Sequence, residues 1–153
     1  MTRKYFRYAA ASLLSMVISL TATTAAAADP GVTDAKIVLG SVTPVSGPPS
    51  LLGKAHMLAL RVWEQDVNAR GGINGRKVEM RQEDDGYVPQ RAVQGVKRLV
   101  DVEGIFGLIG TSGSAMLQAM VPYINEQGLP TINAMAVAAA HFTPPNKTVF
   151  VVG

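Results

Sequence analysis

The chain has 153 residues, of which 14 are Lys or Arg and 11 are Asp or Glu, and it contains no cysteine. The absence of cysteine excludes disulfide frameworks, thiolate zinc sites and thiol nucleophiles, and two histidines are too few for a multi-histidine metal site. Hydrophobic residues make up 48% and charged residues 16%, a composition too apolar for a disordered chain. The formal net charge of +3 would suit nucleic-acid binding only if the surplus lies on the folded part.

Residues 1–28 have the pattern of a secretory signal peptide: basic residues, an apolar stretch, and alanines at 25–28 that offer an A-x-A cleavage site. An uncleaved membrane anchor is the alternative, although hydroxyl residues dilute the stretch. No cysteine follows the alanines, so a lipid anchor of the lipoprotein type is excluded. Cleavage would remove Arg3, Lys4 and Arg7, which leaves 11 basic against 11 acidic residues. A mature chain without net charge has no general attraction to nucleic acid.

The mature chain begins with a strand and a helix. Lys36–Val42 is a β-branched run that predicts a strand, and a loop rich in turn residues follows it over 43–49. Gly71-Gly72 ends the helix, Asn74-Gly75 forms a tight turn, and alternation over Lys77–Glu83 predicts a half-exposed strand at a sheet edge. The apolar period of the helix predicts a buried stripe of Ala55, Leu58, Ala59, Val62, Trp63 and Val67.

Further helices and strands alternate after this unit. A helix from Pro89 is expected to bury Ala92, Val93, Val96, Leu99 and Val100. The continuous apolar run Ile105–Ile109 predicts a central strand, covered on both faces. A third helix over 114–127, a fourth strand over 129–133 and a fifth over 148–152 complete the pattern. Such alternation predicts an α/β fold, a doubly wound parallel sheet with helices on both faces.

In open parallel sheets, ligands bind outside the carboxyl ends of the strands. The segment Gly110–Ser114 is the most suggestive of the loops expected there, because its two glycines allow a sharp turn into the third helix. Unpaired N–H groups at the start of that helix would favour a carboxylate or a phosphate. Ser114 has two interpretations: it contacts a ligand, or it only caps its own helix.

The sequence lacks the motifs that common enzyme classes require. The glycine patterns of dinucleotide-binding and P-loop proteins are absent, and 110–113 does not form a nucleophile elbow. We expect a partly exposed structural position for His56, and a loop position without a ligand for His141. Asp84 and Asp85 could form a metal or acid/base pair, but we favour one carboxylate bracing a loop while the other is solvated. The sequence therefore predicts a binding protein with no catalytic residue, metal or cofactor.

Four motifs carry a resemblance to a known family: IVLGSVTPVSGP (37–48), VNARGGINGRKVEM (67–80), DDGYVPQRAV (84–93) and EQGLPTINA (126–134). On these motifs, residues 32–153 resemble the start of a periplasmic solute-binding protein of the leucine/isoleucine/valine type, which serves an ABC transporter. The resemblance implies a type I periplasmic binding protein, with two α/β lobes that close over a solute. Residues 29–153 would form an incomplete first lobe without the second, and would leave an apolar sheet edge exposed near Val149–Val152.

The resemblance also implies a ligand site in this lobe. Ser114 and neighbouring N–H groups, with Ala115 next, would hold the carboxylate of the solute. The loop after the fourth strand would hold an ammonium group through a carbonyl at Met135 and a hydroxyl at position 137, but Val137 has no hydroxyl. Leu52 stands where family members have an aromatic wall residue. Both departures weaken the case for an ordinary α-amino acid.

The expected function is that of the periplasmic substrate-binding component of an ABC transporter, which binds a branched-chain amino acid or a related small organic acid and has a membrane permease as partner. The alternatives are a binder of aromatic or aliphatic carboxylates and a sensory ligand-binding domain of the same fold. An apolar pocket lined by Met116, Met120 and Met135 would suit such carboxylates, although core packing is favoured for the two helical methionines.

Overall fold

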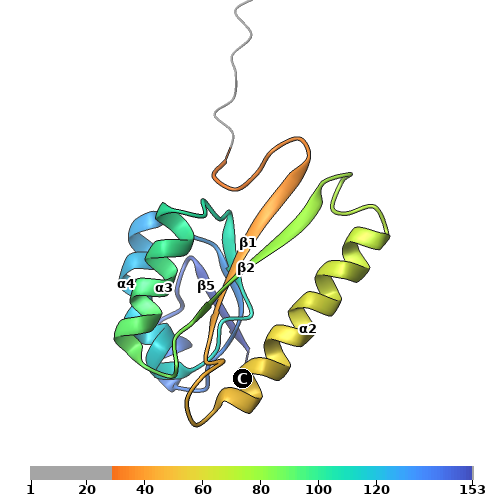
Figure 1. The fold of residues 1–153 in the computed structure, drawn as a ribbon. Helices are drawn as coiled ribbons and strands as arrows, with labels where there is room; N and C mark the ends of the chain where they lie inside the picture. Colours follow the sequence, from red (N-terminus) through yellow and green to blue (C-terminus); the bar gives the residue numbers. More distant parts are fainter. Residues whose placement is uncertain (1–28, 153) are drawn as a thin grey trace, which may run out of the picture.

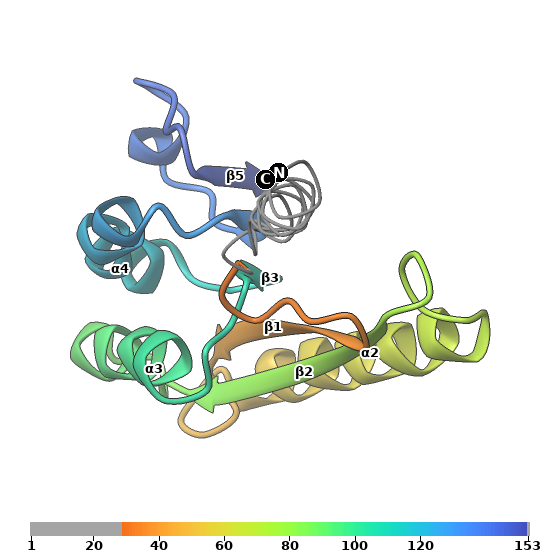
Figure 2. The ribbon, with the colours of Figure 1, turned by 90° about the horizontal axis from the view of Figure 1, so that it is seen from above.

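A computed structural model describes residues 29–152 (Figure 1). Five parallel strands form one sheet in the order β2-β1-β3-β4-β5. The strands are β1 (Lys36–Thr43), β2 (Lys77–Asp84), β3 (Gly107–Ile109), β4 (Thr131–Met135) and β5 (Val149–Val152). The helices are α2 (Ser50–Ala69), α3 (Pro89–Asp101), α4 (Ser114–Gln127) and the short 3-10 helix η2 (Ala139–His141). Figure 2 shows α2 on one face of the sheet and α3 and α4 on the other, which confirms the predicted doubly wound fold.

The strands occupy the positions expected from their composition. The alternating strand β2 and the apolar strand β5 form the two edges, and β3 lies between β1 and β4. β4 begins two residues later than the sequence predicted, because Gly128 has a left-handed φ of 61° and the Leu129 N–H bonds to the Ile124 carbonyl at 2.9 Å. Leu129 thus closes the turn that ends α4 and does not start the strand. The predicted signal peptide lies outside the described residues.

The hydrophobic core lies between the sheet and the pair α3 and α4. Its buried members are Val38, Val42, Ala92, Val96, Leu99, Ile105, Leu108, Met116, Leu117, Met120, Ile124, Leu129, Ala134, Ala136 and Val149. The predicted apolar face of α3 is confirmed, with Val93 and Val100 partly buried at its margin. Met116 and Met120 are 1% and 0% exposed, so they pack in the core and do not line a pocket.

The predicted buried stripe of α2 is wrong. Leu58 and Val62 are 63% and 57% exposed, and the buried residues of this helix are Gly53 and Leu60. Edge strand β2 explains the orientation, because its outer backbone groups bond to α2 side chains. Glu64 Oε1 accepts the Met80 N–H at 3.0 Å, and Asn68 bonds both backbone groups of Val78 at 2.8 Å. Satisfying these groups turns Glu64 and Asn68 toward the sheet and leaves Leu58 and Val62 toward solvent, while Trp63 and Val67 are half-buried.

The start of α2 abuts the end of β1. A Cβ atom at Gly53 would overlap the carbonyl oxygen of Pro44, so only glycine allows this approach. At the other end of the helix, Asn74 and Gly75 have φ of 51° and 80°, which gives the predicted tight turn into β2. Within residues 29–152, no helix is both long and apolar enough to cross a membrane.

Candidate binding site

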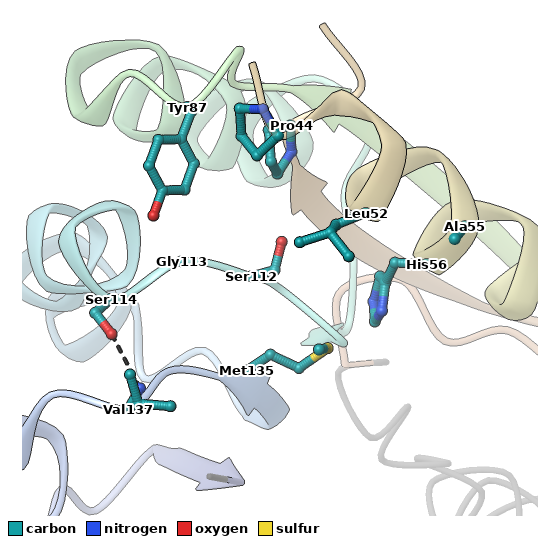
Figure 3. Close-up of a pocket in the computed structure, with 11 residues that line it drawn as sticks. Pro44, Leu52, Ala55, His56, Tyr87, Ser112, Gly113, Ser114, Met135 and Val137 are labelled. Carbon is teal, nitrogen blue, oxygen red and sulfur yellow. Dashed lines mark hydrogen bonds between the residues drawn. The ribbon is translucent and has the colours of Figure 1, made fainter. Parts of the chain in front are cut away.

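A pocket of about 480 Å³ opens at the carboxyl edge of the sheet (Figure 3). It is lined by Pro44, Pro49, Leu52, Ala55, His56, Tyr87, Ser112, Gly113, Ser114, Met135 and Val137. These residues come from the loops that follow β1, β2, β3 and β4, from the first turns of α2, from the end of β4 (Met135) and from the start of α4 (Ser114). Ligand binding was predicted at this edge, and the pocket lies there.

Four of the five predicted site residues meet in this pocket. Leu52 lies on its α2 side, Ser114 at the start of α4, and Met135 and Val137 on the β4 side (Figure 3). The side chain of Ala115 is exposed and does not line the pocket. Ala115 can therefore contribute only its backbone to a ligand held there.

The start of α4 presents unpaired donors beside the pocket. Gly113 has a φ of 101°, and its N–H bonds to the Met135 carbonyl at 3.0 Å, which fixes the turn between β3 and α4. The N–H groups of Ser114, Ala115 and Met116 have no partner among the residues that the structure describes. First-turn N–H groups and the positive end of the helix dipole together favour an anion.

Ser114 does not cap its own helix, so that interpretation is wrong. Its Oγ accepts the N–H groups of Val137 and Ala138 at 2.9 and 3.2 Å, which ties the loop after β4 to α4. A hydroxyl has two acceptor positions and one donor, so the hydrogen of Ser114 remains free to donate to a ligand. His141 strengthens the same junction, because its Nε2 lies 3.0 Å from the Ser114 carbonyl.

His56 forms part of the pocket wall, which the sequence did not indicate. Its Nε2 is buried against the Gly110 backbone without a hydrogen bond of normal geometry among the described residues, and a Cβ at Gly110 would lie 2.5 Å from it. Burial lowers the pKa of His56 below 6.5. The nearby backbone carbonyl of Gly110 acts in the opposite direction but has the smaller effect. The imidazole is therefore neutral at pH 7 and adds no charge to the pocket.

Asp84 and Asp85 hold the loops around the pocket. Asp84 is the brace that the sequence predicted: its carboxylate accepts the N–H groups of Val45 and Ser46, the Ser46 hydroxyl and the Gly86 N–H at 2.5–3.1 Å. The expectation that its neighbour is solvated is wrong, because Asp85 is 0% exposed. Asp85 Oδ1 accepts the Tyr87 N–H at 2.7 Å, while its buried Oδ2 has no hydrogen-bond partner among residues 29–152.

The sequence did not indicate several of the residues that line the pocket. Pro44, Pro49, Tyr87 and Ser112 lie in the loops that the strand pattern placed at the carboxyl edge, but no periodicity distinguishes the residues of a loop that face a pocket. Ala55 lies on α2, where the sequence suggested burial in the core. A positive φ is the signal that would have singled out Tyr87, and a sequence does not show it for a non-glycine residue.

The pocket offers a ligand apolar walls and a few polar donors. The Ser112 hydroxyl pairs with Thr43 Oγ1 at 2.9 Å, and no histidine hydrogen-bonds to it in the described part of the chain. No group of three His, Cys, Asp or Glu side chains that could hold a metal occurs within residues 29–152. None of the residues between 29 and 152 that line the pocket carries a carboxylate, and they combine apolar walls with hydroxyl and N–H donors. A small molecule with one anionic group and an apolar body matches this surface.

Residues 36–153 match the periplasmic binding protein family, and the chain belongs to it. The Leu/Ile/Val-binding protein homolog 8 of Brucella suis biovar 1 (strain 1330) is 34% identical over 125 residues, which cover 82% of this chain and 29% of that protein. Homolog 7 of the same strain is 33% identical over 104 residues, 68% of this chain and 26% of that protein. The chain thus spans under a third of the length of these curated relatives.

Solved structures show the same likeness. A fatty acid ABC transporter substrate-binding protein from Thermomonospora curvata superposes with a TM-score of 0.72 and 32% identity, over 82% of this chain and 31% of that chain. The branched-chain amino acid transporter substrate binding protein LivJ from Streptococcus pneumoniae, solved with isoleucine, gives a TM-score of 0.70 at 22% identity, over 76% of this chain and 33% of that chain. The second likeness shows the fold alone.

Proposed function

We propose that this protein is the substrate-binding component of an ABC transporter and that the pocket is the first-lobe half of its solute cleft. Its role is binding without chemistry, with a membrane permease as the partner that accepts the loaded form. Membership of the periplasmic binding protein family and the likeness to Leu/Ile/Val-binding homologs support this role. Export to the periplasm by a signal peptide over residues 1–28 is part of the proposal and follows from the sequence pattern.

The solute that suits the pocket best is a small organic acid with an apolar body and no ammonium group. One observation carries this choice: unpaired donors at the start of α4 lie beside apolar walls that include Met135 and Val137, and no carboxylate among the described residues lines the pocket. A carboxylate would accept bonds from the Ser114 hydroxyl and the helix N–H groups, while the walls would bury the hydrocarbon. The neighbour named for fatty acids is consistent with such a solute.

A branched-chain amino acid is the second candidate, because the curated relatives are named for leucine, isoleucine and valine. The ammonium group would then need its partners from a second lobe. Leucine and 4-methylpentanoate separate the two candidates, since the two molecules share the carboxylate and the branched chain and differ by the ammonium group.

Calorimetric titration of the protein, in the longest form that its gene encodes, tests the proposal with this pair. We expect 4-methylpentanoate to bind at least tenfold more tightly than leucine, because the ammonium would be desolvated against apolar walls. Tight leucine binding with no response to 4-methylpentanoate would reverse the choice of solute. Failure of both, and of longer alkyl and aryl carboxylates, would contradict the binding of organic acids altogether.

Ser114→Ala is the matching variant. It removes a donor to a charged group, which is worth about 1.5–3 kcal/mol, so affinity for the preferred acid should fall roughly tenfold or more. Ser50→Ala, at the start of α2 and outside the pocket lining, is the control and should bind like the wild type. Equal affinities for the two variants would show that the carboxylate is held elsewhere.

A further inference from the structure

Tyr87 has a backbone conformation that bulky residues avoid. Its φ is 64°, and Asn74, with φ of 51°, is the other non-glycine residue with positive φ in the described part of the chain. Asparagine tolerates the left-handed region because its short side chain bonds locally, whereas an aromatic residue there is uncommon and strained. The fold must therefore hold Tyr87 in place.

Two consecutive carboxylates do this. Asp84 Oδ1 accepts the Gly86 N–H at 2.9 Å, and Asp85 Oδ1 accepts the Tyr87 N–H at 2.7 Å, so each bonds the residue two positions on. The Val88 N–H closes the turn on the Asp85 carbonyl at 2.9 Å. The loop is thus fixed at three successive N–H groups, and Asp84 also ties it to Val45 and Ser46 of the loop after β1.

The ring of Tyr87 does not pack in the hydrophobic core. Tyr87 is 52% exposed and does not belong to the buried cluster. A Cβ atom at Gly113 would lie 3.3 Å from Tyr87 Cε2, so the ring stands beside the turn that opens α4. Figure 3 shows the side chain extending from its loop along the pocket, on the side away from Met135 and Val137. Strained residues held by their surroundings cluster at ligand sites.

We propose that Tyr87 is a specificity-determining residue whose ring forms the wall of the pocket next to the anion-binding start of α4. The inference rests on the proposed function, because it assigns the ring to the apolar body of the solute just beyond its carboxylate. That part of the solute lies between the ring and the Met135 and Val137 side. An aromatic wall offers a large rigid contact surface with few rotatable bonds, which favours apolar atoms at this point.

Tyr87→Gly separates this role from a structural one. Glycine adopts positive φ without strain, so the variant should keep the wild-type Tm or exceed it by a few degrees. Affinity for 4-methylpentanoate should nevertheless fall about five- to tenfold, because the ring contact is lost. Tyr87→Phe should stay within about twofold of the wild type, since it keeps the ring.

Asn74→Gly is the matched control. It also replaces a residue at positive φ by glycine, but it lies in the turn before β2 and outside the pocket lining, so its affinity should equal that of the wild type. Unchanged affinity in Tyr87→Gly would overturn the inference while leaving the proposed function intact. A loss in Tyr87→Phe as large as in Tyr87→Gly would also overturn it, because the hydroxyl would then be the contact. If the wild type binds no organic acid, the proposed function fails and the inference fails with it.

Discussion

Asp84 and Asp85 are consecutive carboxyl groups in opposite electrostatic environments. Burial alone would raise the pKa of Asp84, but hydrogen bonds from the Ser46 hydroxyl and from the N–H groups of Gly86, Ser46 and Val45 outweigh it and lower the pKa from 3.8 to about 2. Burial is also the main influence on Asp85, where one N–H from Tyr87 does not compensate for it, and the pKa is raised above 3.8. The number of donors around each carboxylate decides the direction.

The opposite pKa shifts of Asp84 and Asp85 predict opposite effects of pH on the free energy of unfolding. Asp84 has a lowered pKa, so its stabilisation is complete above about pH 4 and is lost as the pH falls toward 2. Asp84→Asn should therefore lower the free energy of unfolding by about 1–2 kcal/mol at pH 7, and the deficit should shrink toward pH 2. Urea unfolding at several pH values measures it. A deficit independent of pH would show that the charge of Asp84 plays no part.

Asp85→Asn is the contrasting variant, because it keeps an oxygen that can accept the Tyr87 N–H. A raised pKa means that ionisation of Asp85 weakens folding as the pH rises above about 4. The variant should therefore lose less stability than Asp84→Asn at pH 7, and its stability relative to the wild type should improve from pH 3 to pH 7. A parallel pH dependence for both variants would contradict the different environments of the two groups.

At the scale of single residues, the sequence predicted that one of the two aspartates braces a loop, and that Ser114 lies at the helix start. It could not show that Ser114 bonds the loop after β4, because that contact joins residues 23 and 24 positions apart. The buried state of Asp85 was missed for a similar reason. Acidic residues next to a glycine are usually solvated, and only the folded loop places this carboxylate inside.

Helix α2 shows how an element can be predicted while its buried face is not. Apolar periodicity identified the helix, but Leu58 lies on the solvent side and Leu60, 7% exposed, faces the sheet. The polar bonds from Glu64 and Asn68 to edge strand β2 determine this rotation. Hydrophobic patterning assumes that apolar side chains decide which face is buried, and at a sheet edge unpaired backbone groups compete with them.

Alanine substitutions at Leu58 and Leu60 test which of the two side chains of α2 is buried. Leu60→Ala should lower the free energy of unfolding by about 2–4 kcal/mol, because it removes buried methyl groups next to Gly110. Leu58→Ala removes the same atoms from an exposed position and should change it by less than about 0.5 kcal/mol. Both variants keep helix propensity high, so denaturant unfolding isolates the effect of burial. A larger loss at Leu58 would mean that the helix is rotated from the orientation described.

At the scale of the molecule, the helices within residues 29–152 cover only part of one face of the sheet. α2 packs on β2 and β1, as Figure 2 shows, while Ile132, Phe150 and Val152 on β4 and β5 remain 48–58% exposed. Parallel sheets are normally covered on both faces, so this apolar surface favours association. The apolar edge expected near 149–152 is confirmed by the position of β5.

Phe150→Lys tests this surface. The ring is 58% exposed, so lysine should cost little stability but should weaken self-association of the chain. Light scattering after size-exclusion chromatography should give a smaller mean mass for the variant than for the wild type at equal concentration. Val102→Lys, at an exposed position after α3, is the control and should behave like the wild type. Monomeric wild type at high concentration would contradict the prediction.

The parallel sheet and the position of the pocket follow from the alternation of helices and strands, because parallel strands place all their carboxyl ends at one edge. Leu52, Ser114, Met135 and Val137 could therefore be assigned to one region before the structure was known. His56 could not, since its position depends on the rotation of α2. Tyr87 lies in a loop that the pattern placed at this edge, but its place in the pocket lining depends on a strained turn. Local pattern predicts elements, whereas contacts between elements select the side chains that line a cavity.

The contact between Gly53 and the Pro44 carbonyl has a consequence for the thermodynamics of binding. It brings the start of α2 against the end of β1 with no room for a side chain between them, so the helix that carries Leu52 and His56 is held close to β1. This wall is already ordered in the folded protein. Binding of a ligand that fits it therefore costs little conformational entropy on that side. On this side, the fixed space beside α2 would decide which solutes fit. A movement that closes the site around a solute would then come from the parts of the protein opposite this wall.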